Sequence, residues 1–184
     1  VVLDSPHTDN MMTALLNLGA KVWVVRRRQM ISEKLAAQKV MPTPTAIELS
    51  DRTTPAELQL VQETAARYDA VIAAVFVRAN SGSGRMDLAE PVADALTRIA
   101  RRTQATGAPF VAVFFGNPYV ATFLPDLPAT LLTYDFYDLA EMSAVRAIAG
   151  EAPIGGRLPI ALPGLFPVGH GLTRAAVGST AARP

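Results

Sequence analysis

The chain has 184 residues, half of them hydrophobic and 18% charged, and its 17 basic and 16 acidic side chains leave a net charge of +1. This length and apolar content suit a single domain with a full hydrophobic core. The sequence contains no cysteine, which excludes disulfides and thiolate metal sites. The balanced charge gives no electrostatic reason to expect nucleic acid or anionic lipid as a partner, and no apolar run reaches the length of a membrane span. These properties fit a cytoplasmic or an exported protein equally well.

The first quarter of the chain predicts three short strands, at residues 1–4, 21–26 and 45–49, with helices at 10–18 and 30–38 between them. The chain opens directly on Val1-Val2-Leu3, which already reads as a strand and carries no initiator methionine. Because natural N-termini rarely begin inside a core strand, we expect further residues upstream.

The middle of the chain contains the clearest local signal. Thr54, Pro55 and Glu57 place a capping residue, a proline at the first helical position and an acid three residues after the cap, which predicts a helix start. The apolar run at 70–77 shows no polar alternation. It therefore predicts a central strand that is covered on both faces.

Two further strand–helix units follow the polar, glycine-bearing loop at 78–87. We expect a helix at 88–104 with Asp87 as its cap and Pro91 in its first turn, and then a strand at 110–115. After a short helix that ends near residue 124, a strand is expected at 129–134. Asp135 is expected to cap a helix at 136–149 that Gly150 ends.

The composition of the sequence changes after Gly150. Prolines and glycines are frequent at residues 153–171, and their density excludes a helix there. Residues 157–162 could form an edge strand. We expect residues 173–184 to form a flexible tail or a linker. The strand–helix alternation as a whole predicts an α/β domain on a mostly parallel sheet.

In such sheets, ligands bind at the carboxyl ends of the strands, but the motifs there indicate no reaction. Residues 81–85 lack the lysine and the spacing of a phosphate-binding loop, and no G-x-S-x-G nucleophile motif occurs. The two histidines, His7 and His170, do not form a helical pair that could bind a metal, so we expect each to be structural or at the surface. A glycosidase would need two carboxylates across one bond. Four carboxylates are expected near this edge: Asp4, Asp9, Asp87 and Asp135. All of them except Asp4 lie beside expected helix starts.

Three segments together resemble a known family. They are residues 68–75, Phe115-Gly116-Asn117-Pro118-Tyr119, and residues 149–159, which include Gly155-Gly156-Arg157-Leu158-Pro159, with the later residues 166–172. In this order and spacing they resemble the C-terminal domain of glycoside hydrolase family 3, and most closely its bacterial β-N-acetylglucosaminidase branch. The resemblance covers residues 1–172. It implies a three-layer α/β sandwich with a mostly parallel sheet of about six strands and helices on both faces.

The same resemblance implies that this domain follows a (β/α)8 barrel, which carries the aspartate nucleophile and most of the sugar contacts. A barrel of about 250 residues does not fit within this chain. In the β-glucosidase branch, the loop after the central strand supplies a glutamate as acid/base, but residues 78–85 here contain no carboxylate. That difference fits the N-acetylglucosaminidase branch, whose acid/base is a histidine paired with an aspartate on the barrel.

We therefore expect no catalytic residue, no metal and no cofactor in this chain. The residues expected to form a rim facing the barrel are Asn80, Ser81, Ser83 and Arg85, whereas Asn117 is expected to shape the turn after its strand. The expected partners are the barrel of the same parent protein and a glycan in the shared cleft. The parent would be a retaining β-N-acetylhexosaminidase or β-glucosidase-type hydrolase, and the isolated chain would be inactive. Alternative interpretations are a flavodoxin-like module that binds a small ligand and a domain for dimerisation or for anchoring a further domain.

Overall fold

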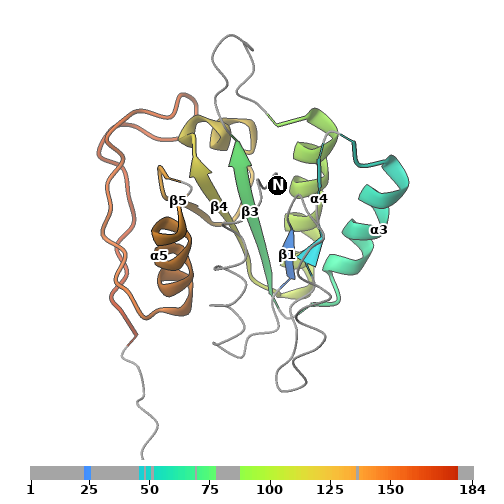
Figure 1. Ribbon diagram of the computed structural model, residues 1–184, viewed down its shortest axis with the longest axis horizontal. Helices are drawn as coiled ribbons and strands as arrows, with labels where there is room; N and C mark the ends of the chain where they lie inside the picture. Colours follow the sequence, from blue (N-terminus) through green and yellow to red (C-terminus); the bar gives the residue numbers. More distant parts are fainter. Residues whose placement is uncertain are drawn as a thin grey trace, which may run out of the picture.

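The computed structural model describes residues 23–25, 46–47, 49–50, 52–68, 70–77, 88–135 and 137–177. Within these ranges the chain is an α/β domain on a twisted parallel sheet (Figure 1). The sequence analysis predicted this fold class correctly. The predicted strand at 1–4 and the predicted helices at 10–18 and 30–38 lie outside the described residues.

The sheet of the described residues has five strands in the order β2-β1-β3-β4-β5, and each neighbouring pair is parallel. This is fewer than the six or so expected. The strands are β1 (Trp23–Val25), β2 (Ala46–Ile47), β3 (Val71–Val77), β4 (Phe110–Gly116) and β5 (Thr130–Leu132). The centre of the sheet is the pairing of β3 with β4, whose register runs from Val71 opposite Phe110 to Val77 opposite Gly116. The apolar run at 70–77 is therefore a central strand, as predicted.

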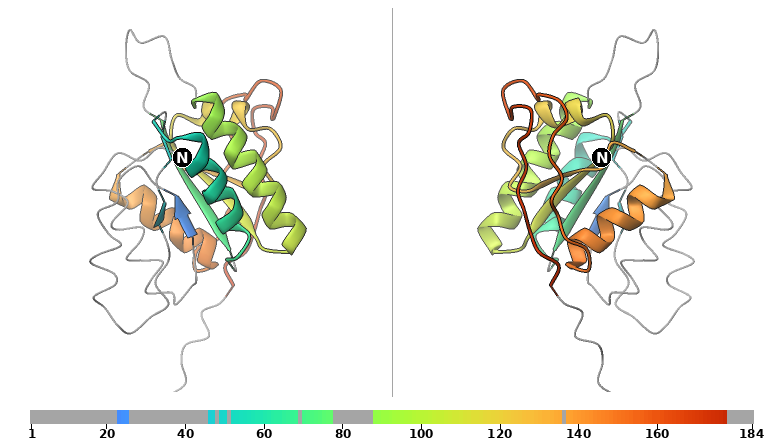
Figure 2. Two further views of the ribbon diagram at one scale, coloured as in Figure 1. Left: turned by 90° about the vertical axis from the view of Figure 1, so that its right-hand side faces the viewer. Right: turned by 90° about the vertical axis from the view of Figure 1, so that its left-hand side faces the viewer.

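The helices of the described residues lie on both faces of the sheet. They are α3 (Pro55–Ala65), α4 (Glu90–Thr106), the 3-10 helix η1 (Pro118–Phe123) and α5 (Asp138–Ala149). Helices α3 and α4 lie side by side on one face, and α5 lies on the opposite face (Figure 2). This arrangement gives the three layers that the sequence analysis expected.

Two of the predicted helix caps are wrong. Helix α4 begins after Ala89 rather than Asp87, without a side-chain cap, and Pro91 lies in its first turn as expected. Proline lacks an N–H group, so the first turn has one donor fewer that needs a cap. Helix α5 begins after Tyr137 rather than Asp135, and Tyr134, just before Asp135, has left-handed backbone. The glycines at both C-caps, Gly107 and Gly150, adopt left-handed backbone conformations with φ of +78° and +79°.

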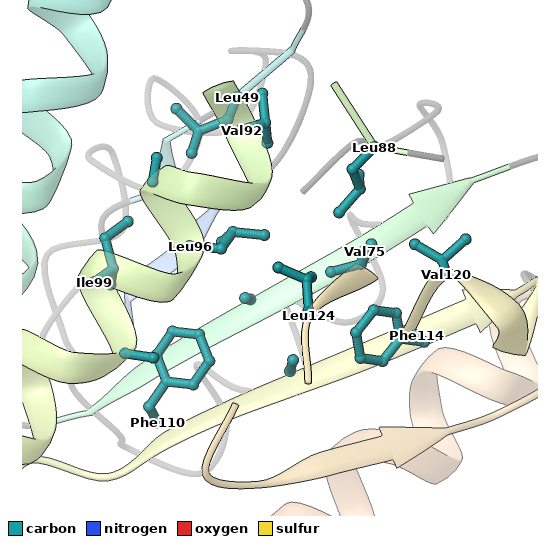
Figure 3. Packing of buried hydrophobic residues seen from close by; sticks show 14 of the residues in the cluster. Leu49, Val75, Leu88, Val92, Leu96, Ile99, Phe110, Phe114, Val120 and Leu124 are labelled. Carbon is teal, nitrogen blue, oxygen red and sulfur yellow. The ribbon is translucent and has the colours of Figure 1, made fainter. Parts of the chain in front are cut away.

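The main hydrophobic core lies between the sheet and the α3–α4 layer (Figure 3). Helix α3 contributes Leu58, Val61 and Ala65, which repeat at the spacing of one helical face. Helix α4 contributes its buried apolar residues in the same way, and Leu96 and Ile99 are completely buried. The alternate β3 residues Val71, Ala73 and Val75 close this core from the sheet side.

The opposite face of the sheet is also apolar. Ile72, Ala74 and Phe76 alternate with the residues of the main core and are equally buried. Phe76 stacks on Phe115 of β4, with the two ring centroids 4.2 Å apart, and the two residues are register partners. Such a stacked cross-strand pair adds about 0.5–1.5 kcal/mol beyond the burial of its area.

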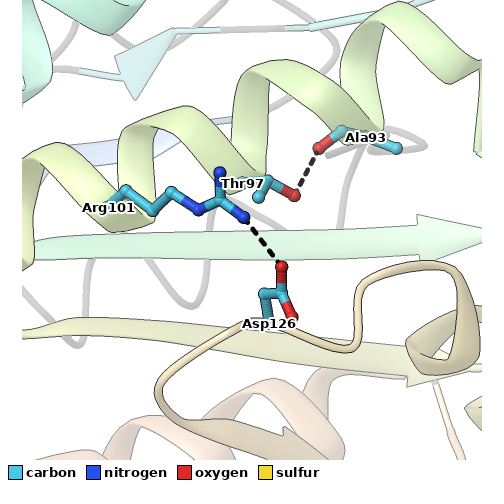
Figure 4. A network of polar contacts seen from close by, with 4 residues as sticks. All are labelled: Ala93, Thr97, Arg101 and Asp126. Atoms are coloured by element: carbon cyan, nitrogen blue, oxygen red, sulfur yellow. Dashed lines mark hydrogen bonds and ion pairs between the residues drawn. The ribbon is translucent and has the colours of Figure 1, made fainter.

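The buried polar residue Thr103 of α4 is satisfied within its own helix. The fully buried Thr103 hydroxyl bonds to the carbonyl oxygens of Ile99 and Ala100, at 3.1 and 2.9 Å, so its burial leaves no open donor. On the surface, Arg101 of α4 pairs with Asp126 at 2.9 Å and links the helix to the loop after η1 (Figure 4). Both side chains are largely exposed, so the pair stabilises the fold by at most about 1 kcal/mol.

A matched pair of leucines tests the packing. We expect Leu96→Ala, at a position that is 0% exposed, to lower the free energy of unfolding by roughly 2–5 kcal/mol through lost burial and a residual cavity. The control, Leu60→Ala on α3, removes the same atoms from a side chain that is 63% exposed and should have little effect. Urea unfolding followed by circular dichroism measures both. Equal losses would contradict the assigned core.

A second pair of measurements tests the capping box of α3. The Thr54 hydroxyl accepts from the Glu57 N–H, and Glu57 Oε2 accepts from the Thr54 N–H at 2.7 Å. Thr54→Ala should cost about 1 kcal/mol, whereas Thr54→Ser should keep most of the stability. The hydrogen bonds from the Thr54 backbone and side chain hold the pKa of Glu57 below its ordinary value of 4.5.

A lowered pKa in the folded state stabilises the protein above the unfolded value, and this stabilisation is lost as the pH falls through the folded value. The stability difference between wild type and Glu57→Gln should therefore be present above about pH 4.5 and disappear in stronger acid. A difference that stayed constant with pH would rule out this ionised cap.

Candidate functional site at the carboxyl edge of the sheet

The candidate site is the edge where β4 and β5 end. Strand β4 ends at Gly116, whose φ is +83°, and the chain turns at once into η1. Strand β5 ends at Leu132, and residues 133–135 follow it. Because the strands are parallel, both exits lie at one edge, which is where α/β sheets collect ligands and partners.

Asn117 shapes the first exit, as predicted. Its Oδ1 accepts a hydrogen bond from the Tyr119 N–H at 3.1 Å and caps η1. Its Nδ2 is buried and has no hydrogen-bond partner in the structure. An unsatisfied buried donor costs about 1–3 kcal/mol of folding free energy. The Oδ1 of Asn117 therefore stabilises the turn through its hydrogen bond, whereas the buried Nδ2 destabilises the folded state.

Tyr134 shapes the second exit and is the one non-glycine residue with a positive φ, +60°, in the described part of the chain. Thr133 holds the turn on either side of it. The Thr133 N–H donates to the Phe114 carbonyl at 3.1 Å, and the Thr133 hydroxyl donates to the Asp135 carbonyl at 2.8 Å. Partial burial raises the pKa of the Tyr134 phenol above its ordinary value of 10.0. Left-handed backbone at a bulky residue is strained and occurs preferentially at functional sites.

Exposed aromatic residues follow both exits along the chain. Tyr119 and Phe123 of η1 are 41% and 50% exposed, and Tyr134 and Tyr137 after β5 are 42% and 59% exposed. We call these four residues the aromatic ledge. From residue 103 to residue 134 the sequence has a single charged side chain, Asp126, and its carboxylate is turned toward Arg101 of α4.

The C-terminal strap, residues 152–177, doubles back on itself beside β5 and α5 (Figures 1 and 2). Its two arms are joined by hydrogen bonds at both ends, from Ile154 to Arg174 and from Leu158 to His170, each with an N–O distance of 2.8 Å. Leu158 and Leu162 enter the main core, but no strand forms at 157–162. The arms pair mainly with each other, because the prolines and glycines between them prevent a continuous strand.

Three residues explain the unusual sequence of the strap. A Cβ at Gly171 would collide with the Gly156 carbonyl oxygen, so the arms require glycine there. Arg157 donates to the Gly171 carbonyl and, at 3.2 Å, to the Thr173 hydroxyl. His170 stacks on Phe166 with ring centroids 4.2 Å apart, which agrees with a structural role for this histidine.

The predicted tail begins inside the strap. Arg174 pairs with Ile154, and the Val177 N–H donates to the Gly150 carbonyl at 2.8 Å, so residues 173–177 lie along the domain. Residues 178–184 lie outside the described part.

The predicted rim residues Asn80, Ser81, Ser83 and Arg85 also lie outside the described residues, and their role stays a prediction. The aromatic ledge was not anticipated from the sequence. Two features of the sequence could have predicted it. Residues 103–134 carry almost no charge, and several aromatic residues lie in short loops rather than in strands. Among the described residues, no group of acidic or histidine side chains is placed to hold a metal ion, and no helix is long and apolar enough to cross a membrane.

Comparison with protein families and with curated proteins finds no match. Among solved structures, the chain is similar to part of a fungal multi-domain family 3 β-N-acetylglucosaminidase that contains a GCN5-related glucosamine N-acetyltransferase region. The identity is 21% and the TM-score 0.53, over 83% of this chain and 17% of that one. A 3-dehydroquinate dehydratase-like protein from Bifidobacterium longum is 14% identical with a TM-score of 0.37, over 70% of this chain and 95% of that one.

The first likeness shows a shared fold, and the chain spans less than a fifth of that protein's length. The second overlap is too poor to bear on the fold.

Two tyrosines with equal exposure test the strain at the candidate site. Asparagine tolerates left-handed backbone, so Tyr134→Asn should relieve strain while losing a partly buried ring. Tyr119→Asn loses a ring that is similarly exposed, 41% against 42%, from a residue with negative φ. We expect the free energy of unfolding of Tyr134→Asn to exceed that of Tyr119→Asn by about 1 kcal/mol. Equal stabilities in urea titration would show that Tyr134 is not strained.

Proposed function

We propose that this chain is the C-terminal, largely non-catalytic domain of a retaining β-N-acetylhexosaminidase or β-glucosidase-type glycoside hydrolase. The observation that carries the proposal is the fold it shares with part of a family 3 β-N-acetylglucosaminidase, over 83% of this chain. The sequence segments that resemble this family support the same assignment independently. The most specific of them, around Gly156 and Arg157, forms the strap that closes the domain.

The chemistry of the described edge favours a supporting domain over a complete enzyme. A retaining glycosidase needs two carboxyl groups about 5–5.5 Å apart. In the described segments at the ends of β4 and β5, residues 116–119 and 133–135, Asp135 is the one carboxylate. The catalytic carboxylates would therefore come from a (β/α)8 barrel in the parent protein, and this domain would form one wall of the cleft.

The substrate class follows from the loop after β3. Residues 78–85 contain no carboxylate that could act as acid/base. We therefore propose N-acetylglucosamine-containing glycans as substrates, with a histidine–aspartate pair on the barrel as acid/base. No cofactor is needed for this reaction.

Hydrolysis of an aryl N-acetyl-β-glucosaminide tests the proposal. The parent protein with its barrel should release the aryl group, while the isolated 184-residue chain should not, because it lacks the nucleophile. An aryl β-glucoside serves as the substrate control and should be hydrolysed more slowly. Turnover by the isolated chain, or a parent without glycosidase activity, would refute the proposal.

Two further assays on the isolated chain separate the alternatives. Acetyl transfer from acetyl-coenzyme A to glucosamine is measured because the fungal neighbour also contains an acetyltransferase region. Thermal melting with and without N-acetylglucosamine detects a free-standing binding module, because a bound ligand raises the melting temperature. The proposal expects neither transfer nor a shift, and a positive result in either assay would contradict it.

A further inference from the structure

Strand β5 is the last strand of the described sheet, and its ladder partners all lie on β4. Just after β5, the Thr133 N–H donates to the Phe114 carbonyl of β4 at 3.1 Å, so the backbone groups of Thr133 face β4. The backbone groups of successive residues in a strand point in alternate directions. The N–H and carbonyl groups of Thr130 and Leu132 therefore point away from β4, toward the outer side of the sheet.

Nothing within β5 itself discourages pairing with another strand. Residues 127–134 contain no charged side chain, and β5 contains no proline. The side chain of Thr130 is exposed, and those of Leu131 and Leu132 are half-buried. Natural proteins protect such edges with charges, prolines, bulges or a covering segment. Because β5 lacks charges and prolines, we looked for a segment that covers it.

The C-terminal strap, residues 152–177, is placed to be that segment, since it lies beside β5 in the views of both Figure 1 and Figure 2. Its two isolated bridges join Ile154 to Arg174 and Leu162 to Phe166, and neither of them involves β5. The four prolines of the strap, at positions 153, 159, 163 and 167, have no N–H to donate. A segment that is paired with itself and poor in donors can cover an edge without extending the sheet.

The strap is attached to the domain in two different ways. At its base, the Val177 N–H donates to the Gly150 carbonyl at 2.8 Å. Further along, in the described structure, the backbone hydrogen bonds of residues 158–170 all join the strap to itself. Leu158 and Leu162, which are 8% and 1% exposed, belong to the main core. Burial of these two leucines therefore holds this part of the strap against the domain.

We propose that the strap guards the edge strand β5: it covers β5 without pairing with it and so prevents β5 from adding a strand of a second copy of this chain. Release of the strap would expose an uncharged edge whose outward N–H and carbonyl groups can form a new ladder. The inference concerns the folded chain by itself, so it holds whether or not the parent protein is a glycosidase.

Two buried leucines provide a matched test in the 184-residue chain. Leu162→Ala removes an anchor of the strap, whereas Leu96→Ala removes the same atoms from α4 at the same depth, 1% against 0% exposed. In sedimentation velocity, Leu162→Ala should associate at concentrations at least tenfold below those at which Leu96→Ala does. The wild-type chain should stay monomeric over the same range. Gly171→Ala, which forces the strap arms apart at the Gly156 carbonyl, is a second strap variant that leaves the core unchanged.

A pair of lysine substitutions shows whether the association uses β5. Thr130→Lys adds a charge to an exposed residue of β5, and Gln104→Lys adds the same charge to an exposed residue of α4. In the Leu162→Ala background, Thr130→Lys should weaken association at least tenfold, because a lysine on an edge strand hinders strand addition. Gln104→Lys should leave association almost unchanged. Amides of residues 129–133 should also exchange at least tenfold more slowly in the associated form.

Four outcomes would overturn the inference. Strap variants that fold, as judged by circular dichroism, and remain monomeric would show that β5 needs no guard. Equal association of Leu96→Ala and Leu162→Ala would show that any loss of core packing suffices. Equal effects of the two lysines would exclude β5 as the pairing surface. A wild-type chain that associates as strongly as the strap variants would show that the strap does not block the edge.

Discussion

The fold depends on the burial of β3 and β4 from both sides. Six of the seven β3 residues and five of the seven β4 residues are buried, and none of them is charged. Two neighbouring parallel strands of this kind cannot face water, because each face exposes a continuous apolar surface. Helices α3 and α4 therefore cover one face, and α5 lies on the other. The layer order follows from this single requirement.

The same constraint determines the character of the carboxyl edge. The chain turns through left-handed backbone at Gly116, where the buried strand β4 ends, and at Tyr134, shortly after the partly exposed strand β5. These short exits project aromatic side chains rather than long polar loops. Across the described strand ends, residues 116–119 and 133–135, Asp135 is the one charged residue.

The strap contributes rigidity at the same end of the domain. Its arms are held by paired backbone hydrogen bonds, by Arg157 and by the close approach of Gly156 and Gly171, while Leu158 and Leu162 anchor it in the core. The strap, which holds the most specific part of the sequence, thus stabilises the domain.

The sequence by itself determined the strand–helix alternation, the parallel sheet, the central place of β3, the capping box at Thr54 and the turn at Asn117. These features depend on apolar periodicity or on neighbours within four residues, which can be read along the chain. Only the tertiary structure decided that α4 and α5 start after Ala89 and Tyr137, that the strap pairs with itself, and that Tyr134 adopts left-handed backbone. Those outcomes depend on contacts between residues far apart in sequence and on strain at Tyr134, and neither leaves a periodic signal in the chain.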